Sequence, residues 1–118
     1  MVLRSPSPAE LTLLDFLICG VELFEPSEGL LGRLKVADMD DDGMGSLRLF
    51  PTGSFAPNAR FGKRASACQF TDVDGVEVIA SLNFDQYGNL YELDIWRTDF
   101  GKLIRIPDNK NELRREEP

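Results

Sequence analysis

The sequence contains no histidine, and its two cysteines, Cys19 and Cys68, lie far apart in the chain. Without histidine there is no Ser-His-Asp or Cys-His catalytic arrangement and no imidazole ligand for a metal. The cysteines form neither a CxxC motif nor a disulfide framework, and such isolated thiols fit a reducing compartment. We therefore expect a protein that is not an enzyme, has no catalytic residues and needs no cofactor.

Long hydrophobic runs are absent as well. Residues 11–21 are the compact apolar run near the N-terminus, but they contain Asp15 and follow Glu10. The run lacks the basic segment and the cleavage site of a signal peptide, and it is too short to span a bilayer. We expect a cytoplasmic protein with no membrane partner.

Positive charge is scarce, because 13 Lys and Arg residues stand against 20 Asp and Glu, for a net charge of -7 and a pI of about 4.5. Nucleic acids are bound through Lys and Arg, so a nucleic-acid partner is not expected. The acidic surplus is concentrated in residues 65–108. A field of one sign on half of a small domain steers a basic partner towards it, although surplus acid can also serve only to keep a protein soluble.

A short pattern near the N-terminus predicts one helix. Ser7, Pro8 and Glu10 have the spacing of a capping box with proline at the first helical position. Leucines then recur at helical spacing as far as Gly20, which is typical of a helix end. The expected helix is Pro8–Cys19, and its wide apolar stripe requires a sheet to cover it.

Beyond the helix the hydrophobic period changes to two, which predicts strands. We expect an α+β fold, with the N-terminal helix packed on an antiparallel meander sheet of about five strands and residues 103–107 as a short edge strand. Residues 1–108 are expected to form a single domain and residues 109–118 a charged C-terminal tail that frays. The predicted core consists of Leu14, Leu17, Ile18, Val36, Leu47, Leu49, Phe70, Val78, Leu82, Tyr91, Leu93 and Ile95.

The turn at residues 86–89 defines the register of the central hairpin. If this loop has four residues, Asp85 faces Leu90, and Tyr91, Leu93 and Ile95 continue the buried face of the preceding strand. The opposite face then carries cross-strand neighbours. These pairs are Asn83 with Glu92, Ser81 with Asp94, and Ile79 with Trp96.

Residues 38–43 read Asp-Met-Asp-Asp-Asp-Gly, which matches the first half of a calcium-binding loop. The twelfth position of such a loop is a bidentate glutamate, but here it is Leu49, which the sheet needs in its core. An acidic hairpin turn is the favoured interpretation of Asp38–Asp42, and a cation site is the alternative.

Glu92 and Asp94 point to the same side of one strand, with Cα atoms about 6.5–7 Å apart. A glycosidase uses such a carboxylate pair, but nothing else in the sequence indicates a sugar cleft. The only tryptophan, Trp96, follows on the same face. Either the long loop 51–62 or the C-terminal segment covers Trp96, or it is an anchor for a partner.

The order of three motifs resembles an uncharacterised family of small bacterial domains. The motifs are a Pro-x-Glu-x-x-Leu-Leu helix at residues 8–14, a Gly-Met-Gly-Ser-Leu-Arg turn at 43–48 and a Glu-Leu-Asp-Ile-Trp block at 92–96. The resemblance covers nearly the whole chain and implies no activity. In type, small acidic α+β domains of this kind resemble immunity proteins, which neutralise nuclease or other toxins of competing cells.

Two functions remain open at this point. The first is a non-catalytic immunity protein that occludes the active site of a basic toxin domain, such as a nuclease, by charge complementarity and an aromatic anchor. Its candidate partner-binding residues are Asp72, Asp74, Asp85, Tyr87, Glu92, Asp94 and Trp96. The second is a small-ligand or cation-binding module that uses the Asp38–Asp42 cluster or a pocket between helix and sheet.

Overall fold

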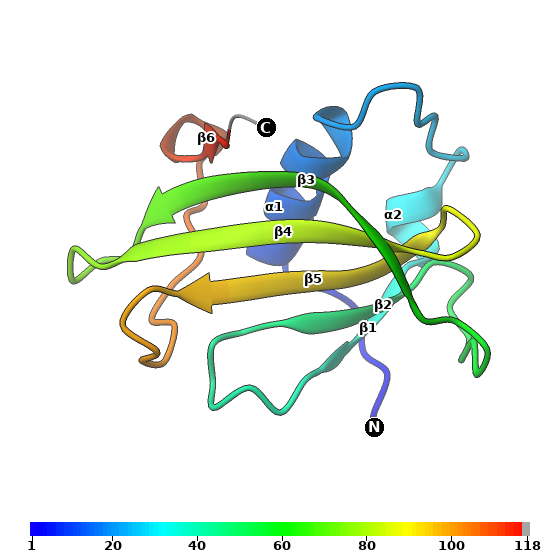
Figure 1. Cartoon of the computed structure of the whole chain (residues 1–118), viewed down its shortest axis with the longest axis horizontal. Helices are drawn as coiled ribbons and strands as arrows, with labels where there is room; N and C mark the ends of the chain where they lie inside the picture. The colour runs from blue at the N-terminus through cyan, green and yellow to red at the C-terminus, as the bar shows by residue number, and fades with distance from the viewer. Residues whose placement is uncertain (117–118) are drawn as a thin grey trace.

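Six antiparallel strands form one open sheet in the order β1-β2-β5-β4-β3-β6, and the main helix packs against one of its faces (Figure 1). The computed structural model describes residues 1–116. Its elements are α1 (Pro8–Cys19), α2 (Leu30–Arg33), β1 (Lys35–Asp38), β2 (Leu47–Phe50), β3 (Phe61–Thr71), β4 (Glu77–Asp85), β5 (Leu90–Arg97), the 3-10 helix η1 (Lys110–Glu112) and β6 (Arg114–Arg115). The predicted α+β fold is confirmed, with six strands where about five were expected.

The helix α1 has the predicted bounds because both of its ends are specified locally. The Ser7 hydroxyl accepts a hydrogen bond from the Glu10 amide at 3.1 Å, and the Glu10 carboxylate accepts one from the Ser7 amide at 2.8 Å. This reciprocal pair satisfies two amides that the first helical turn leaves without partners. Leu13, Leu14 and Leu17 turn from α1 towards the sheet and are completely buried.

The core lies between α1 and the sheet, and every residue predicted for it is buried except Tyr91. The predicted pairing of Asp85 with Leu90 is wrong: Leu90 pairs with Phe84, after a shift in register next to Asn83. One extra residue in β5 therefore brings Leu90 into the core and leaves Tyr91 half-buried. The guanidinium of Arg48 lies 4.1 Å from the centre of the Tyr91 ring.

The C-terminal segment contributes to the domain as far as Glu116, whereas a fraying tail was expected. Leu113 is buried in the core, and β6 pairs with β3 opposite Cys68 and Gln69. Lys110 of η1 also forms an ion pair with Asp15 of α1. The last two residues of the predicted tail, 117 and 118, lie outside the described part of the chain.

The expected edge strand at residues 103–107 does not form, and β6 occupies an edge of the sheet instead. The backbone amides of Ile104 and Arg105 donate to the carboxylate of Asp72, so they are not used in a strand ladder. Leu103 and Ile106 pack against the core from this irregular segment. Among the described residues no helix is long and apolar enough to cross a lipid bilayer.

The two faces of the sheet differ in what covers them. In Figure 1, α1 lies behind the sheet and no helix lies in front of β3, β4 and β5. We call this uncovered side the open face. Side chains that alternate with the core residues of β4 and β5 project from it. Ser81 and Asn83 of β4 are buried there, so the part available to another molecule is the side of β5 that carries Asp94 and Trp96.

Candidate functional site

The open face carries the three cross-strand pairs that the sequence predicts. In the β4–β5 ladder Asn83 lies opposite Glu92, Ser81 opposite Asp94, and Ile79 opposite Trp96. The Asn83 amide donates to the Glu92 carboxylate at 2.9 Å. Glu92, Asp94 and Trp96 therefore share one strand and one face, as expected.

Two aromatic side chains are exposed together at the end of β5. Trp96 is 39% exposed and Phe100 is 70% exposed, and their ring centroids are 6.0 Å apart at an interplanar angle of 57°. We call Glu92, Asp94, Trp96 and Phe100 the acid–aromatic patch. Phe100 was not predicted for the site, because it follows the end of β5 in the sequence. Its contact with Trp96 places it at the open face.

Phe100 also has a backbone conformation that is unusual for its residue type. Its φ angle is +62°, in the left-handed region that a bulky side chain rarely occupies. No residue pattern around Phe100 indicates this conformation. An exposed aromatic residue held in a strained turn is a reason to look for a binding role.

The carboxylate of Asp94 lies in an environment that disfavours its charge. Partial desolvation on the sheet and the nearby negative charge of Asp41 raise the pKa of Asp94 above its usual value. Asp41 is held in place because its carboxylate accepts the Ser46 amide at 2.9 Å. A hydrogen bond from Ser46 and the positive charge of Arg64 act in the opposite direction but are smaller, so Asp94 and Asp41 leave a surplus of negative charge on the side of β5 that carries Trp96.

Two of the predicted partner-binding residues, Asp72 and Asp74, instead form an ion-pair network with Arg97. The Arg97 guanidinium is 2.9 Å from the Asp72 carboxylate, contacts Asp74, and donates from Nε to Asp99 at 2.8 Å. The side chain of Asp72 is 0% exposed. Asp72 therefore has no exposed side-chain surface with which to contact a partner.

This network attaches the segment after β5 to the β3–β4 turn. Burial opposes ionisation of Asp72, but hydrogen bonds from the amides of Ile104 and Val73 and from Arg97 together hold its pKa below the usual value. Arg97 and the Gly101 amide lower the pKa of Asp99 to about 2. The network thereby positions the turn that displays Phe100.

A signal for this network was present in the sequence. Arg97 continues the core-facing alternation of Leu93 and Ile95, and it is 5% exposed. A cation at a core position requires buried acidic partners, and the nearest acidic turn contains Asp72 and Asp74.

The remaining two predicted residues, Asp85 and Tyr87, lie in the hairpin at the opposite end of β5. Asp85 is 7% exposed, and one of its oxygens accepts the amides of Tyr87 at 2.8 Å and Asn89 at 3.0 Å. Tyr87 is exposed at the hairpin tip. The seven predicted residues are thus divided among the open face, the Arg97 network and this hairpin.

The acidic cluster at Asp38–Asp42 is used for contacts within the chain. Asp38 forms an ion pair with Arg4 at 2.8 Å, and Asp41 accepts the Ser46 amide. Within residues 1–116 no three acidic or cysteine side chains are grouped so that they could hold a metal ion. The geometry therefore gives no support to a cation site at this turn.

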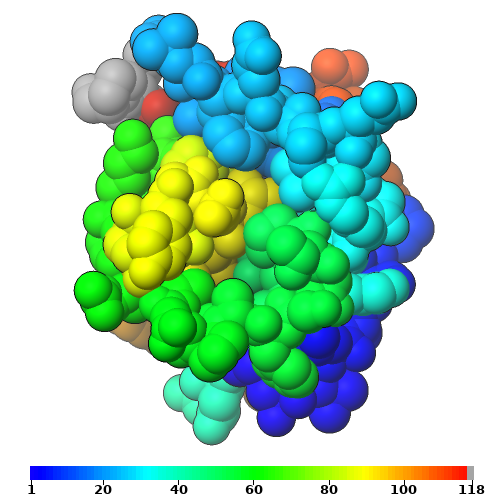
Figure 2. Space-filling model, turned by 90° about the vertical axis from the view of Figure 1, so that its right-hand side faces the viewer, coloured from blue at the N-terminus to red at the C-terminus, as the bar shows by residue number. Residues whose placement is uncertain are grey.

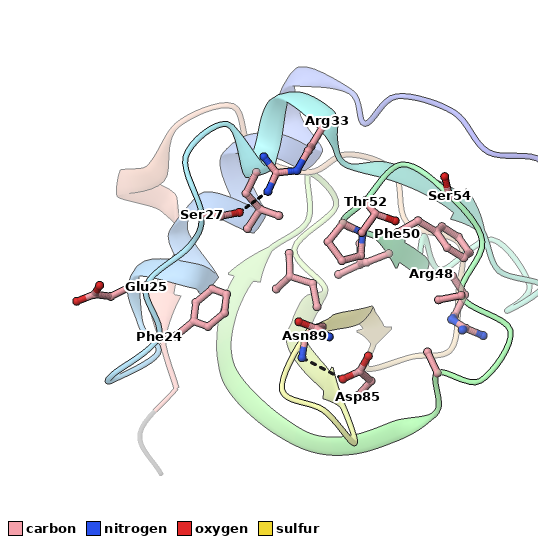
Figure 3. Close-up of a pocket in the computed structure, with 16 residues that line it drawn as sticks. Phe24, Glu25, Ser27, Arg33, Arg48, Phe50, Thr52, Ser54, Asp85 and Asn89 are labelled. Atoms are coloured by element: carbon pink, nitrogen blue, oxygen red, sulfur yellow. Dashed lines mark hydrogen bonds between the residues drawn. The ribbon is translucent and has the colours of Figure 1, made fainter.

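A pocket of about 340 Å³ opens beside the β4–β5 hairpin. Figure 2 looks onto this end of the molecule, where the hairpin, the loop after β2 and the segment around α2 meet. Apolar side chains such as Phe24, Leu49 and Leu90 line it together with Asp85 and Asn89 (Figure 3). Glu92 and Asp94 do not line this pocket.

Comparison with known proteins gives a family for this chain. A family model described as "Domain of unknown function (DUF6984)" matches residues 3–107. The chain belongs to the DUF6984 family. This assignment agrees with the expected resemblance to an uncharacterised family of small domains. Beyond DUF6984, neither a curated protein nor a solved structure matches the chain.

Proposed function

We propose that this DUF6984 domain is a non-catalytic binding protein whose open face docks onto a basic protein surface. The observation that carries the proposal is the acid–aromatic patch, where exposed Trp96 and Phe100 touch each other beside the carboxylates of Asp94 and Glu92. Single exposed apolar residues are common on proteins, but an aromatic pair flanked by acids on an uncovered sheet face is typical of a contact surface.

The two components of the patch have different physical roles in binding. Tryptophan is enriched among residues whose truncation costs the most affinity, because it buries a large area with few rotatable bonds. The carboxylates, in a chain of net charge -7, attract a positively charged partner and speed its association. The two aromatic rings would thus slow dissociation of the complex, and the two carboxylates would speed its association.

The partner class that fits best is a toxin domain of the nuclease type. A nuclease needs a basic cleft to hold phosphates, and an acidic surface with an aromatic anchor is complementary to such a cleft. In this proposal the domain is a cytoplasmic immunity protein of a bacterium, and it neutralises the toxin by occluding its active site without turnover. The surface position of Asp94, on the same strand face as Trp96, suits occlusion of a partner's active site.

The test is a binding measurement with the product of the gene immediately upstream, by surface plasmon resonance over a series of salt concentrations. Association should slow as salt rises, since the Debye length falls to about 3 Å at 1 M. Asp94→Lys should slow association markedly, whereas the matched charge reversal Glu112→Lys, on η1, should have little effect. Trp96→Ala should act on dissociation, at a cost of about 2–4 kcal/mol.

Two results would count against the proposal. Equal effects of Asp94→Lys and Glu112→Lys on a folded protein would show that the contact surface is elsewhere. Turnover of nuclease, glycosidase, esterase or phosphatase substrates by the isolated domain, abolished by Glu92→Gln, would show that the carboxylate pair is catalytic.

A further inference from the structure

The pocket beside the β4–β5 hairpin is separate from the acid–aromatic patch. Leu90 lines the pocket at the start of β5 and Trp96 lies six residues further along the strand, a separation of about 20 Å. A volume of about 340 Å³ lies at the lower end of the range for small-molecule sites. A protein docked on the patch would leave this pocket open.

Asp85 is the charged group placed deepest in the pocket wall. It is 7% exposed, and its Oδ1 accepts the amides of Tyr87 and Asn89. Within residues 1–116 its other oxygen, Oδ2, accepts no hydrogen bond, and Asp85 takes part in none of the ion pairs. Among the described residues Arg48 Nε, and not Asp85 Oδ2, is the fully buried side-chain atom without a partner, so Oδ2 is reachable from solvent and free to accept from a bound donor.

The other charged side chains of the pocket are directed elsewhere. Arg33 donates to the Glu28 carbonyl at 2.7 Å and contacts the Ser27 hydroxyl. Arg48 stacks over Tyr91, and Figure 3 shows its guanidinium and the carboxylate of Glu25 directed away from the centre of the pocket. The charge presented to a molecule inside is therefore that of Asp85.

The surroundings of Asp85 limit the size and polarity of what could bind. Figure 3 shows Asn89 next to Asp85, joined to its carboxylate by the hydrogen bond from the Asn89 backbone amide. Asn89 also lines the pocket, and its side-chain amide oxygen is a second possible acceptor. The walls mix apolar residues, including Phe24, Leu49 and Leu90, with polar residues such as Thr52 and Ser54. The pocket thus combines an acidic group at the hairpin with an apolar wall formed by Phe24, Leu49 and Leu90.

We propose that this pocket binds a small primary ammonium ion that carries an apolar body. The ammonium group donates to Asp85 Oδ2 and to the Asn89 side chain, and the hydrocarbon part packs against Phe24, Leu49 and Leu90. A hydrogen bond between charged groups in a partly dry pocket gives the affinity, and the apolar walls select against a fully hydrated inorganic cation.

The test is a titration of the ¹⁵N-labelled protein with 3-methylbutan-1-amine, followed by amide chemical shifts. The neutral control ligand is 3-methylbutan-1-ol, which has the same carbon skeleton. Shifts should saturate and be largest at the amides of Tyr87, Asn89 and Leu90. The amine should bind about tenfold more tightly than the alcohol, because the alcohol cannot form the charge-assisted hydrogen bond.

Asp85→Asn is the informative variant, since an amide oxygen can still accept from the two hairpin amides. It should abolish the preference for the amine, while the matched exposed variant Asp40→Asn should keep it. If Asp85→Asn does not fold, Asn89→Ala replaces it and should reduce the preference. Absence of saturation, equal affinity for amine and alcohol in the wild type, or shifts mapping away from the hairpin would each overturn the proposal.

Discussion

Replacing Asp72 by asparagine tests whether the Arg97 network is structural. Asp72 Oδ1 accepts the amides of Val73 at 2.8 Å and Arg105 at 3.1 Å. Its Oδ2 accepts the Ile104 amide and the Arg97 guanidinium, both at 2.9 Å. Asparagine has nearly the same shape, but in either orientation its NH₂ group faces two donors, so two hydrogen bonds are lost.

The magnitude follows from the burial of this site. Each buried donor left without a partner costs about 1–3 kcal/mol, and breaking a buried ion pair costs about 3–5 kcal/mol. Because Arg97 keeps Asp74 and Asp99 as partners, we expect Asp72→Asn to lower the free energy of unfolding by about 3–5 kcal/mol. That is a large share of the roughly 5–15 kcal/mol that stabilises a typical domain.

Urea unfolding followed by Trp96 fluorescence and circular dichroism measures this loss. With a slope of about 2 kcal/mol per M, a loss of 4 kcal/mol moves the midpoint by about 2 M. The control is Asp108→Asn, an exposed acid paired with Arg105 at the surface, which should change stability by less than about 0.5 kcal/mol. An Asp72→Asn variant within 1 kcal/mol of the wild type would refute the structural role.

The pH dependence of the Asp72 effect has a defined sign. Folding lowers the pKa of Asp72 below its usual 3.8, so its ionised form contributes stability that is complete above that value. The contribution is lost as pH falls through the lower pKa of the folded state. The difference in stability between wild type and Asp72→Asn should therefore be largest at neutral pH and narrow below pH 3.8.

Three further outcomes are expected. Leu93→Ala should cost about 2–5 kcal/mol in urea unfolding, because Leu93 is completely buried. Folding raises the pKa of Asp94 above 3.8, so the negative charge of Asp94 destabilises the folded protein above that pH. Asp94→Asn should therefore raise the urea midpoint at neutral pH and leave it unchanged below pH 3.8. A thiol reagent at pH 8 should label exposed Cys19 and spare Cys68, since burial raises the pKa of the Cys68 thiol to about 11.

The elements predicted most accurately from the sequence are those specified by near neighbours. The helix bounds depend on Ser7, Glu10 and Gly20, which act within one turn. The pairing of Ser81 with Asp94 follows from the length of the turn that joins the two strands, and it is confirmed. Tyr91 was misplaced because a single extra residue reverses the face of a strand, and the bulge that contains it has no local sequence marker.

The candidate site was harder to predict because its members come from distant parts of the chain. The sequence alone does not distinguish an acidic turn residue that faces solvent from one that pairs with a buried arginine. Asp72 and Asp85 differ in role only because Arg97 folds against the first and an apolar pocket forms beside the second. Phe100 lies next to Trp96 in a turn where its φ angle is positive, and no sequence pattern indicates that conformation.

The acid–aromatic patch concentrates local features that cost stability. Partial burial and the nearby charge of Asp41 raise the pKa of Asp94, Trp96 keeps 39% of its surface in water, and Phe100 holds a φ of +62°. A left-handed backbone at a non-glycine residue costs about 1–2 kcal/mol. Selection for stability alone would replace such residues. Their grouping on one exposed surface therefore fits selection for binding.

Phe100→Asn tests whether Phe100 is present for binding or for stability of the fold. Asparagine tolerates the left-handed backbone conformation, so this variant removes the ring without adding strain. Relief of the strain should offset the lost contact with Trp96, which is worth about 0.5–1.5 kcal/mol, and leave the free energy of unfolding within about 1 kcal/mol of the wild type. Binding of the basic partner should weaken through faster dissociation. A loss of stability above about 2 kcal/mol, with binding unchanged, would mean that Phe100 supports the fold and that the patch does not contact the partner there.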